Sequence, residues 1–264
     1  MSENVMKSKR FVVRMSLVGK NQVIVITGAG SGVGRDSARL FLEKGWKVAL
    51  IGRRMETLEE TAQNHKNAIC VKCDVSDFKA VKDGFSTIVV EFGRVDVLFN
   101  NAGLAKPSQT IDELNVEDWK EVVNINLNGS FFCAKEAFTT MRHQKPQGGR
   151  IINNGSVSSY VPRPGSAPYT STKHAITGLT RSISLDGRPY SIVCGQIDIG
   201  NALTPMAHQM TIGVPQADGT IKAEATMDPS NVSKTLLHMA ELPIEANVQF
   251  VTVMASTMPY IGRG

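Results

Sequence analysis

A tyrosine and a lysine four residues apart, Tyr169 and Lys173, are the residues of this 264-residue chain best suited to proton transfer. Residues with this spacing share one face of a helix, so the ammonium group can lie beside the phenol oxygen. A nearby positive charge favours the phenolate and lowers the tyrosine pKa from about 10. Tyr169 is therefore a candidate general acid or base for a hydroxyl or carbonyl substrate. Taken alone, the pair also fits an ordinary exposed helix pair.

Continuous apolar runs alternate with more polar, helix-like segments along most of the chain. Such runs are typical of strands that are buried on both faces of a parallel sheet. The expected strands are 22–27, 46–51, 68–73, 95–99, 150–153, 191–197 and 249–254; the expected helices include 35–44, 55–65, 77–92, 116–141 and 169–185. The pattern predicts an α/β fold, a single doubly wound (Rossmann-type) domain of about seven parallel strands with helices on both faces.

Composition and charge limit the classes of partner. Hydrophobic residues make up 42% of the chain and charged residues 20%, which is ordinary for a globular protein. The net charge is +5, but residues 1–20 carry five basic residues and one acidic residue, so the rest is nearly neutral. A nucleic-acid partner gains no support from this distribution. We expect residues 1–20 to be a basic, partly disordered extension and residues 21–264 to form the domain.

No apolar run approaches the roughly 18 residues that a membrane span needs. The N-terminus also lacks the apolar core of a secretory signal, so we expect a cytoplasmic protein with no membrane partner. Cys70 and Cys73 have a metal-like spacing, but no second pair completes a zinc site, and we expect buried thiols. The five histidines have no ligand spacing, and no metal is expected.

A glycine-rich turn directly follows the first expected strand. Glycines permit a tight turn and close approach of the backbone, and a helix N-terminus presents free N–H groups to a diphosphate. In a doubly wound sheet, ligands bind beyond the carboxyl ends of the strands. A purely structural turn is the alternative. We expect a nucleotide to contact this turn through Gly28, Ser31, Gly32, Val33 and Gly34.

Two arginines, Arg53 and Arg54, follow the second expected strand, where NAD-binding proteins commonly place an acidic residue. An arginine at this point accommodates the 2′-phosphate of NADP. Two solvated arginines at the start of a helix are the alternative. The sequence therefore predicts NADP(H) as the preferred cofactor, with NAD(H) possible.

From about residue 21 to its C-terminus, the chain resembles the short-chain dehydrogenase/reductase family in its single-domain branch. The motifs that carry the resemblance are Thr27-Gly28-x3-Gly32-x-Gly34, Cys73-Asp74-Val75, Asn100-Asn101-Ala102-Gly103, Asn126 in Asn-Ile-Asn-Leu-Asn-Gly, and Ser156, Tyr169 and Lys173. The resemblance implies that Asp74 and Val75 contact the adenine and that Asn101, Ala102 and Gly103 line the cofactor cleft. It also implies that Thr204, after Gly200, lies near the nicotinamide, although Ile199-Gly200 replaces the usual Pro-Gly.

The same resemblance implies catalytic roles for four residues. Tyr169 would exchange the proton on oxygen, and Lys173 would lower its pKa and hold the ribose. Ser156 would bind the carbonyl oxygen, and Asn126 would anchor a water in a proton relay. Taken singly, Ser156 also fits a turn serine and Asn126 a capping or kinking residue. The resemblance further implies a homodimer or homotetramer formed by the two long helices.

These observations predict an NADP(H)-dependent oxidoreductase that interconverts a ketone or aldehyde and an alcohol. The alternatives are a non-catalytic cofactor-binding sensor or scaffold, and a lyase or epimerase on the same fold. Residues 201–226 show no clean periodicity and contain two methionines, Met206 and Met210, which suit a surface that closes over apolar ligands. We expect them to form a lid over a mainly apolar carbonyl substrate; a solvated insertion is the alternative.

Overall fold

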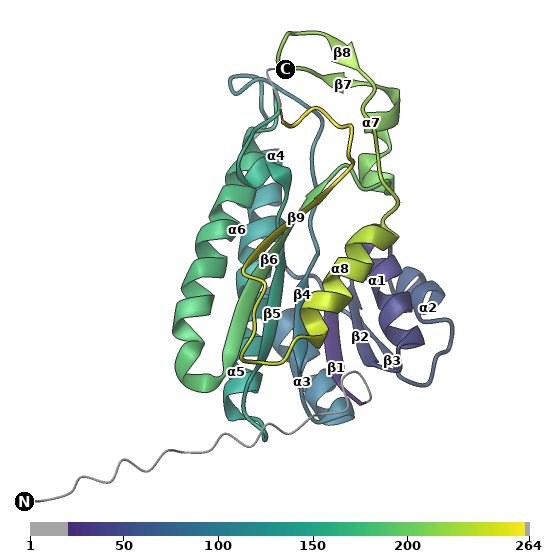
Figure 1. Cartoon of the computed structure of the whole chain (residues 1–264), viewed down its shortest axis with the longest axis vertical. Coiled ribbons are helices and arrows are strands. Elements are labelled where there is room, and N and C mark those ends of the chain that lie inside the picture. Colours follow the sequence, from purple (N-terminus) through teal and green to yellow (C-terminus); the bar gives the residue numbers. More distant parts are fainter. Residues whose placement is uncertain (1–20, 262–264) are drawn as a thin grey trace, which may run out of the picture.

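The computed structural model describes residues 21–261, so the predicted extension at residues 1–20 lies outside the described part. A seven-stranded parallel sheet runs through the molecule in the order β3-β2-β1-β4-β5-β6-β9 (Figure 1). Its strands are β1 (Val23–Thr27), β2 (Lys47–Gly52), β3 (Ala68–Lys72), β4 (Val97–Asn100), β5 (Gly149–Asn154), β6 (Ile192–Gly200) and β9 (Phe250–Met254). The predicted doubly wound α/β domain with about seven parallel strands is confirmed.

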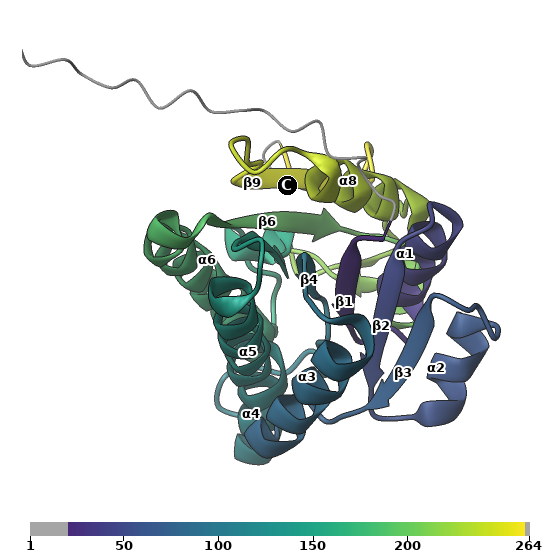
Figure 2. The same cartoon turned by 90° about the horizontal axis from the view of Figure 1, so that it is seen from below.

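Helices cover both faces of this sheet, as the view in Figure 2 shows. The first layer contains α1 (Gly32–Glu43), α2 (Met55–Ala62) and α8 (Ser230–Glu241); the second contains α3 (Phe78–Phe92), α5 (Ser130–His143) and α6 (Ala167–Asp186). The two layers pack on opposite faces of the sheet, and the side chains of β1 point alternately into one layer and the other. Ile24 and Ile26 belong to the first core, and Val23 and Val25 to the second.

Local signals set where several helices begin and end. The Asp77 side chain accepts hydrogen bonds from the N–H groups of Lys79 and Ala80 and so caps α3. Asn115 caps α4 (Val116–Val123) in the same way through Glu117. Gly45 follows α1 with φ +83°, a left-handed conformation that favours glycine at a helix end. These caps place most predicted boundaries within a few residues of the observed ones.

The predicted long helix over 116–141 is present, but it is not α-helical throughout. A π-helical segment, Asn124–Gly129, separates α4 from α5. The side chain of Asn126 leaves the helix here and binds both main-chain groups of Leu104, at 2.9 Å each. The long-range bonds favour the wider turn, and such insertions are frequent at functional sites.

The segment 201–226 is more ordered than its sequence pattern indicates. It contains a short helix, α7 (Gln209–Ile212), and a two-stranded hairpin of β7 (Val214–Pro215) and β8 (Ile221–Lys222). Figure 1 shows both beyond the carboxyl end of the sheet. Strand β6 also continues past its predicted end, because it pairs with β9 up to Gly200 opposite Met254.

Across residues 21–261, no helix combines the length and the apolar character that crossing a membrane requires. In the same range, no group of three or more histidine, cysteine or acidic side chains could hold a metal ion. Cys73 is buried and Cys70 partly buried, both as free thiols. Burial raises the pKa of Cys73 to about 11, so this thiol stays protonated and inert at neutral pH.

Candidate active site

A cleft of about 860 Å³ opens beyond the carboxyl end of the sheet. It lies where the strand order reverses between β1 and β4, the usual ligand site of an open α/β sheet. Most of the residues predicted to contact cofactor or substrate line it together: Gly28, Ser31, Gly32, Val33, Asn101, Ala102, Gly103, Ser156, Tyr169 and Thr204. Residues from five different parts of the chain therefore share one cavity.

The glycine turn has no room for side chains. Gly28 and Gly32 have φ of +66° and +51°. A Cβ added to Gly28 would lie 2.9 Å from the Cα of Ala102, and one added to Gly34 would lie 2.3 Å from the carbonyl oxygen of Gly28. A Cβ at Gly32 would come within 3.2 Å of Thr204. The turn Gly28–Gly32, called the cradle below, thus exposes its main chain between the 101–103 segment and Thr204.

Helix α1 begins at this cradle with an open N-terminus. Ser31 is its N-cap, yet the Ser31 side chain makes no capping hydrogen bond, and the first turn contains no acidic residue. The first N–H groups of a helix carry a partial positive charge and bind phosphate well. The cradle and the open helix end fit the diphosphate of a dinucleotide.

Thr27 fixes the geometry of the switch point. Its hydroxyl oxygen accepts hydrogen bonds from the N–H groups of Asn101 and Ala102, at 2.9 Å each. The Asn101 amide in turn donates to the Thr27 carbonyl at 2.9 Å. The ends of β1 and β4 are therefore locked together directly beneath the glycine turn.

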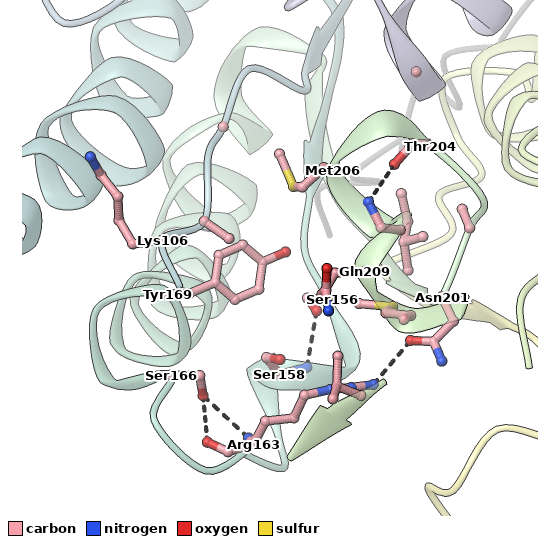
Figure 3. Close-up of a pocket in the computed structure, with 18 of the residues that line it drawn as sticks. Lys106, Ser156, Ser158, Arg163, Ser166, Tyr169, Asn201, Thr204, Met206 and Gln209 are labelled. Atoms are coloured by element: carbon pink, nitrogen blue, oxygen red, sulfur yellow. Dashed lines mark hydrogen bonds between the residues drawn. The ribbon is translucent and has the colours of Figure 1, made fainter. Parts of the chain in front are cut away.

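Tyr169 projects from the first turns of α6 into the cleft, with its phenol oxygen directed toward Ser156 (Figure 3). Lys173 is buried one turn further along; its Nζ donates to the carbonyl oxygen of Asn154 at 2.7 Å and lies 5.4 Å from the Tyr169 ring centroid. Asn154 donates to the Asn101 side chain at 2.9 Å. A hydrogen-bonded chain therefore connects the lysine to the cofactor cradle.

Electrostatics at Tyr169 differ from the expectation. Burial raises the pKa of Tyr169 above its ordinary value, Ser156 and Arg163 oppose the shift, and the charge of Asp198 adds to it. The predicted net lowering of the Tyr169 pKa is therefore wrong, because burial dominates. Lys173 Nζ lies over the tyrosine ring, and burial lowers its own pKa to about 8. Tyr169 is therefore a neutral phenol at neutral pH in the cofactor-free site.

Asn126 lies behind the cleft wall rather than on it. Besides its bonds to Leu104, its Nδ2 donates to Thr172 Oγ1 at 3.4 Å, one residue before Lys173. A Cβ on Gly103 would lie 3.3 Å from Asn126 Oδ1, so the asparagine packs directly against this segment. Asn126 therefore joins the wall of the cofactor cleft to the helix that carries Tyr169 and Lys173.

The predicted adenine end forms a second hollow of about 300 Å³, which Arg53 and Asp74 line. Arg53 and Arg54 are exposed, and neither guanidinium group has a hydrogen bond or ion pair within residues 21–261. By contrast, Arg35 forms an ion pair with Glu60 nearby. Two unengaged cations at this point fit an additional phosphate.

Five predicted contact residues line neither hollow: Gly34, Arg54, Val75, Lys173 and Gly200. Val75 is buried and packs on Gly129, whose added Cβ would lie 2.8 Å from Val75 Cγ2. Gly200 is also buried, and its added Cβ would lie 2.7 Å from both Met254 Cβ and Met258 Sδ. Its bare Cα therefore serves packing on β9, and its neighbours Ile199 and Asn201 line the cleft in its place.

Sequence reasoning missed several polar residues at the site. Asn154 holds Lys173, Arg163 and Lys106 line the cleft, and Asp198 lies beneath Ser156. The signal for Asp198 was an acidic residue between two isoleucines within a strand-like run. The other residues gave no signal, because their contacts depend on the tertiary fold.

The family model described as short chain dehydrogenase matches residues 22–213. A 3beta-hydroxysteroid dehydrogenase of Mediterraneibacter gnavus is 34% identical over 210 residues, 77% of this chain and 74% of that protein. Sulfoacetaldehyde reductase 2 of Chromohalobacter salexigens is 31% identical over 238 residues, 89% of this chain and 94% of that protein.

Among solved structures, a 3-ketoacyl-(acyl-carrier-protein) reductase from Brucella melitensis complexed with NADH covers 90% of this chain and 98% of its own, with a TM-score of 0.81. Its 22% identity makes this a likeness of fold. The match to the family model covers most of the chain, and the relatives are named for chemistry on hydroxyl and carbonyl groups. The chain therefore belongs to the short-chain dehydrogenase/reductase family and is an NAD(P)-dependent oxidoreductase that acts on CH–OH groups.

Proposed function

We propose that this oxidoreductase interconverts a ketone or aldehyde and the corresponding alcohol with NADP(H), and that Tyr169 exchanges the proton on oxygen. The observation that carries the proposal is the shared cleft: Tyr169 and Ser156 face the same cavity as the Gly28–Gly32 cradle. The bound nicotinamide supplies or accepts the hydride. All other steps belong to residues of the chain.

Each residue of the site has a physical role in this proposal. Tyr169, held as a neutral phenol by burial, donates a proton to the oxygen of a carbonyl substrate. The Ser156 hydroxyl donates a hydrogen bond to the same oxygen and stabilises its developing charge. Lys173, fixed by the Asn154 carbonyl, places a positive charge beside the tyrosine. Asn126 holds the cleft wall at Leu104 against α6, because it binds Leu104 on one side and Thr172 on the other.

The cleft supports a mainly apolar substrate. Its outer part is lined by Leu114, Pro168, Met206, Met210 and Val214. The cations Lys106 and Arg163 also reach the cleft, but Lys106 is paired with two acidic residues and Arg163 with Glu224. A panel of apolar and charged carbonyl compounds, followed by NADPH absorbance, tests the function. Turnover of none of them, with the folded protein binding NADPH, would favour a non-catalytic role.

Cofactor preference gives a direct test of the arginines. We expect NADPH to bind at least about tenfold more tightly than NADH, equivalent to about 1.4 kcal/mol. Arg53→Asp should reverse the preference, since an acidic residue there binds ribose hydroxyls and repels a phosphate. Fluorescence titration with both cofactors measures this. Lys66→Asp, the same charge change at an exposed residue outside both hollows, is the control and should leave the ratio unchanged.

Residues 201–226 act as a lid in this proposal. Met206, Met210 and Val214 contribute to the cleft wall. Arg163, in the loop before α6, binds Glu224 and Asn201 and so ties the segment to the loop that precedes Tyr169. We expect amide hydrogen exchange in 203–219 to slow when NADPH and a turnover substrate bind. Helix α3, which lies away from the cleft, is the internal reference. Equal exchange of the segment in both states would contradict closure.

We also propose a homodimer or homotetramer. Large apolar side chains stay exposed on α4, α5 and α6, with Trp119 at 38%, Phe131 at 48% and Leu185 at 60% exposure. Exposed apolar side chains on neighbouring helices suit an interface between copies. Light scattering that gives the mass of a single chain at micromolar concentration would contradict this assembly.

A further inference from the structure

Asp198 is a carboxylate in the interior of the sheet. It lies on β6 between Ile197 and Ile199 and has no exposed surface. Within residues 21–261, no lysine, arginine or histidine nitrogen forms an ion pair with it. Burying a carboxylate without a cation is costly unless hydrogen bonds compensate. A buried acid next to a catalytic cleft therefore requires a specific explanation.

Hydrogen-bond donors surround this carboxylate. Its Oδ1 accepts from the Ser156 main-chain N–H at 2.9 Å, the Ser159 hydroxyl at 3.1 Å and the Gln196 amide at 2.7 Å. Its Oδ2 accepts from the Tyr160 hydroxyl at 3.1 Å. An ionised carboxylate accepts and does not donate, so the four donors fit the charged form.

The turn that carries Ser156 is built against this carboxylate. A Cβ added to Gly155 would lie 2.0 Å from Asp198 Oδ1, so only a glycine lets the main chain come this close. Ser156 and Ser159 then cap the following short helix reciprocally. Because three of the four donors come from residues 156–160, Asp198 fixes the whole turn that presents the Ser156 hydroxyl.

Its charge also reaches the proton-transfer pair. Asp198 acts to raise the pKa of Tyr169 and the pKa of Lys173, against the burial that lowers the latter to about 8. The other charged or titratable groups around the pair are Arg163 from the preceding loop and Lys106 across the cleft. On its far side, Asp198 faces Tyr160, which is influenced by Arg181 and Tyr260.

We propose that Asp198 is a positioning residue of this active site, whose carboxylate holds the Ser156 turn and whose negative charge acts on the Tyr169 and Lys173 pair. The proposal rests on the proposed function of Tyr169 and Ser156. It separates into a charge effect and a positional effect, which different substitutions remove.

Asp198→Asn isolates the charge. The amide oxygen still accepts from Ser156, Ser159 and Gln196, and the amide nitrogen can donate to the Tyr160 hydroxyl. Without the negative charge, Tyr169 and Lys173 lose their protons at lower pH. The alkaline decline of kcat for carbonyl reduction should therefore move to lower pH by about half a unit or more. Tyr160→Phe removes one hydrogen bond and keeps the charge, so its pH profile should match that of the unmodified enzyme.

Asp198→Ala removes the acceptors that hold the turn. We expect kcat to fall by about 10–100-fold, because a misplacement of about 1 Å has effects of this size. The KM for NADPH should change little, since the cofactor cradle lies on other strands. Circular dichroism checks the fold. If this variant does not fold, Asp198→Asn decides the charge effect, and Ser159→Ala, which removes the hydroxyl bonds to Asp198 and to the Ser156 N–H, decides the positional effect through the same fall in kcat.

The tyrosinate absorbance of the cofactor-free protein gives a readout that needs no activity. The difference between chains with and without Tyr169→Phe isolates the ionisation of Tyr169, and Asp198→Asn should lower its midpoint. An unshifted midpoint and pH profile would overturn the charge effect, and a folded Asp198→Ala with unchanged kcat would overturn the positional one. Failure of the proposed function would look different: Tyr169→Phe would remain active while the Tyr169 midpoint still responded to Asp198.

Discussion

Tyr169→Phe is expected to lower kcat by about 10²–10⁴-fold, the usual contribution of general acid–base catalysis. The substitution removes one hydroxyl and keeps the ring that packs in the cleft wall. The fold and the binding of NADPH should therefore survive, because the cradle at Gly28–Gly32 and the bond between Lys173 and Asn154 do not involve the phenol oxygen.

Steady-state kinetics with NADPH and fluorescence titration separate loss of chemistry from loss of binding. Tyr190→Phe is the matched control: Tyr190 packs edge-on against Phe138 on the far part of the second layer, and phenylalanine keeps that contact. It should retain full activity. If Tyr169→Phe keeps more than about a tenth of kcat, another group donates the proton.

The fold was predictable because its signals are local. Buried parallel strands appear as apolar runs such as 22–27, and caps such as Asp77 mark helix starts by residue type alone. The glycine turn was equally readable, since its spacing follows from backbone conformation at Gly28 and Gly32. The helix α8 was not anticipated, and its cap residue, Pro229, makes no side-chain capping bond.

The parts that sequence reasoning missed depend on contacts between distant residues. The π-helical turn at Asn126 forms because its side chain binds Leu104, which is 22 residues away. The raised pKa of Tyr169 arises from burial by the surrounding loops, which no spacing of charges expresses. The role of Gly200 is set by Met254 on β9 and Met258 just after it, both more than 50 residues further along the chain.

The cleft illustrates how local and distant information combine. The motif residues locate the site, since parallel strands end at one edge of the sheet. The properties of the site come from residues outside the motifs, among them Asn154, which holds Lys173, and Asp198, which holds the Ser156 main chain. Among proteins that share the motif residues, substrate specificity and the pH dependence of kcat should therefore vary more than the type of reaction.

Ser156→Ala is expected to lower kcat for carbonyl reduction by about 10²–10³-fold, the typical effect of removing one donor to a developing oxyanion. The substitution is a clean test, because alanine keeps the main-chain N–H that Asp198 accepts at 2.9 Å. The turn should hold its position, and the remaining structural loss is the bond from the Ser158 N–H to the serine hydroxyl at 3.1 Å.

That lost cap is worth about 1 kcal/mol of stability, which thermal unfolding measures. Ser158→Ala is the control, since Ser158 lines the same cleft and its hydroxyl has no hydrogen bond within residues 21–261. This variant should keep kcat within about threefold, because the substrate oxygen does not bind the Ser158 hydroxyl in the proposed mechanism. Equal losses in both variants would mean that polarity of the wall, rather than a hydrogen bond from Ser156, stabilises the oxygen. A loss confined to Ser156→Ala, with NADPH binding unchanged, assigns the serine to the reacting oxygen.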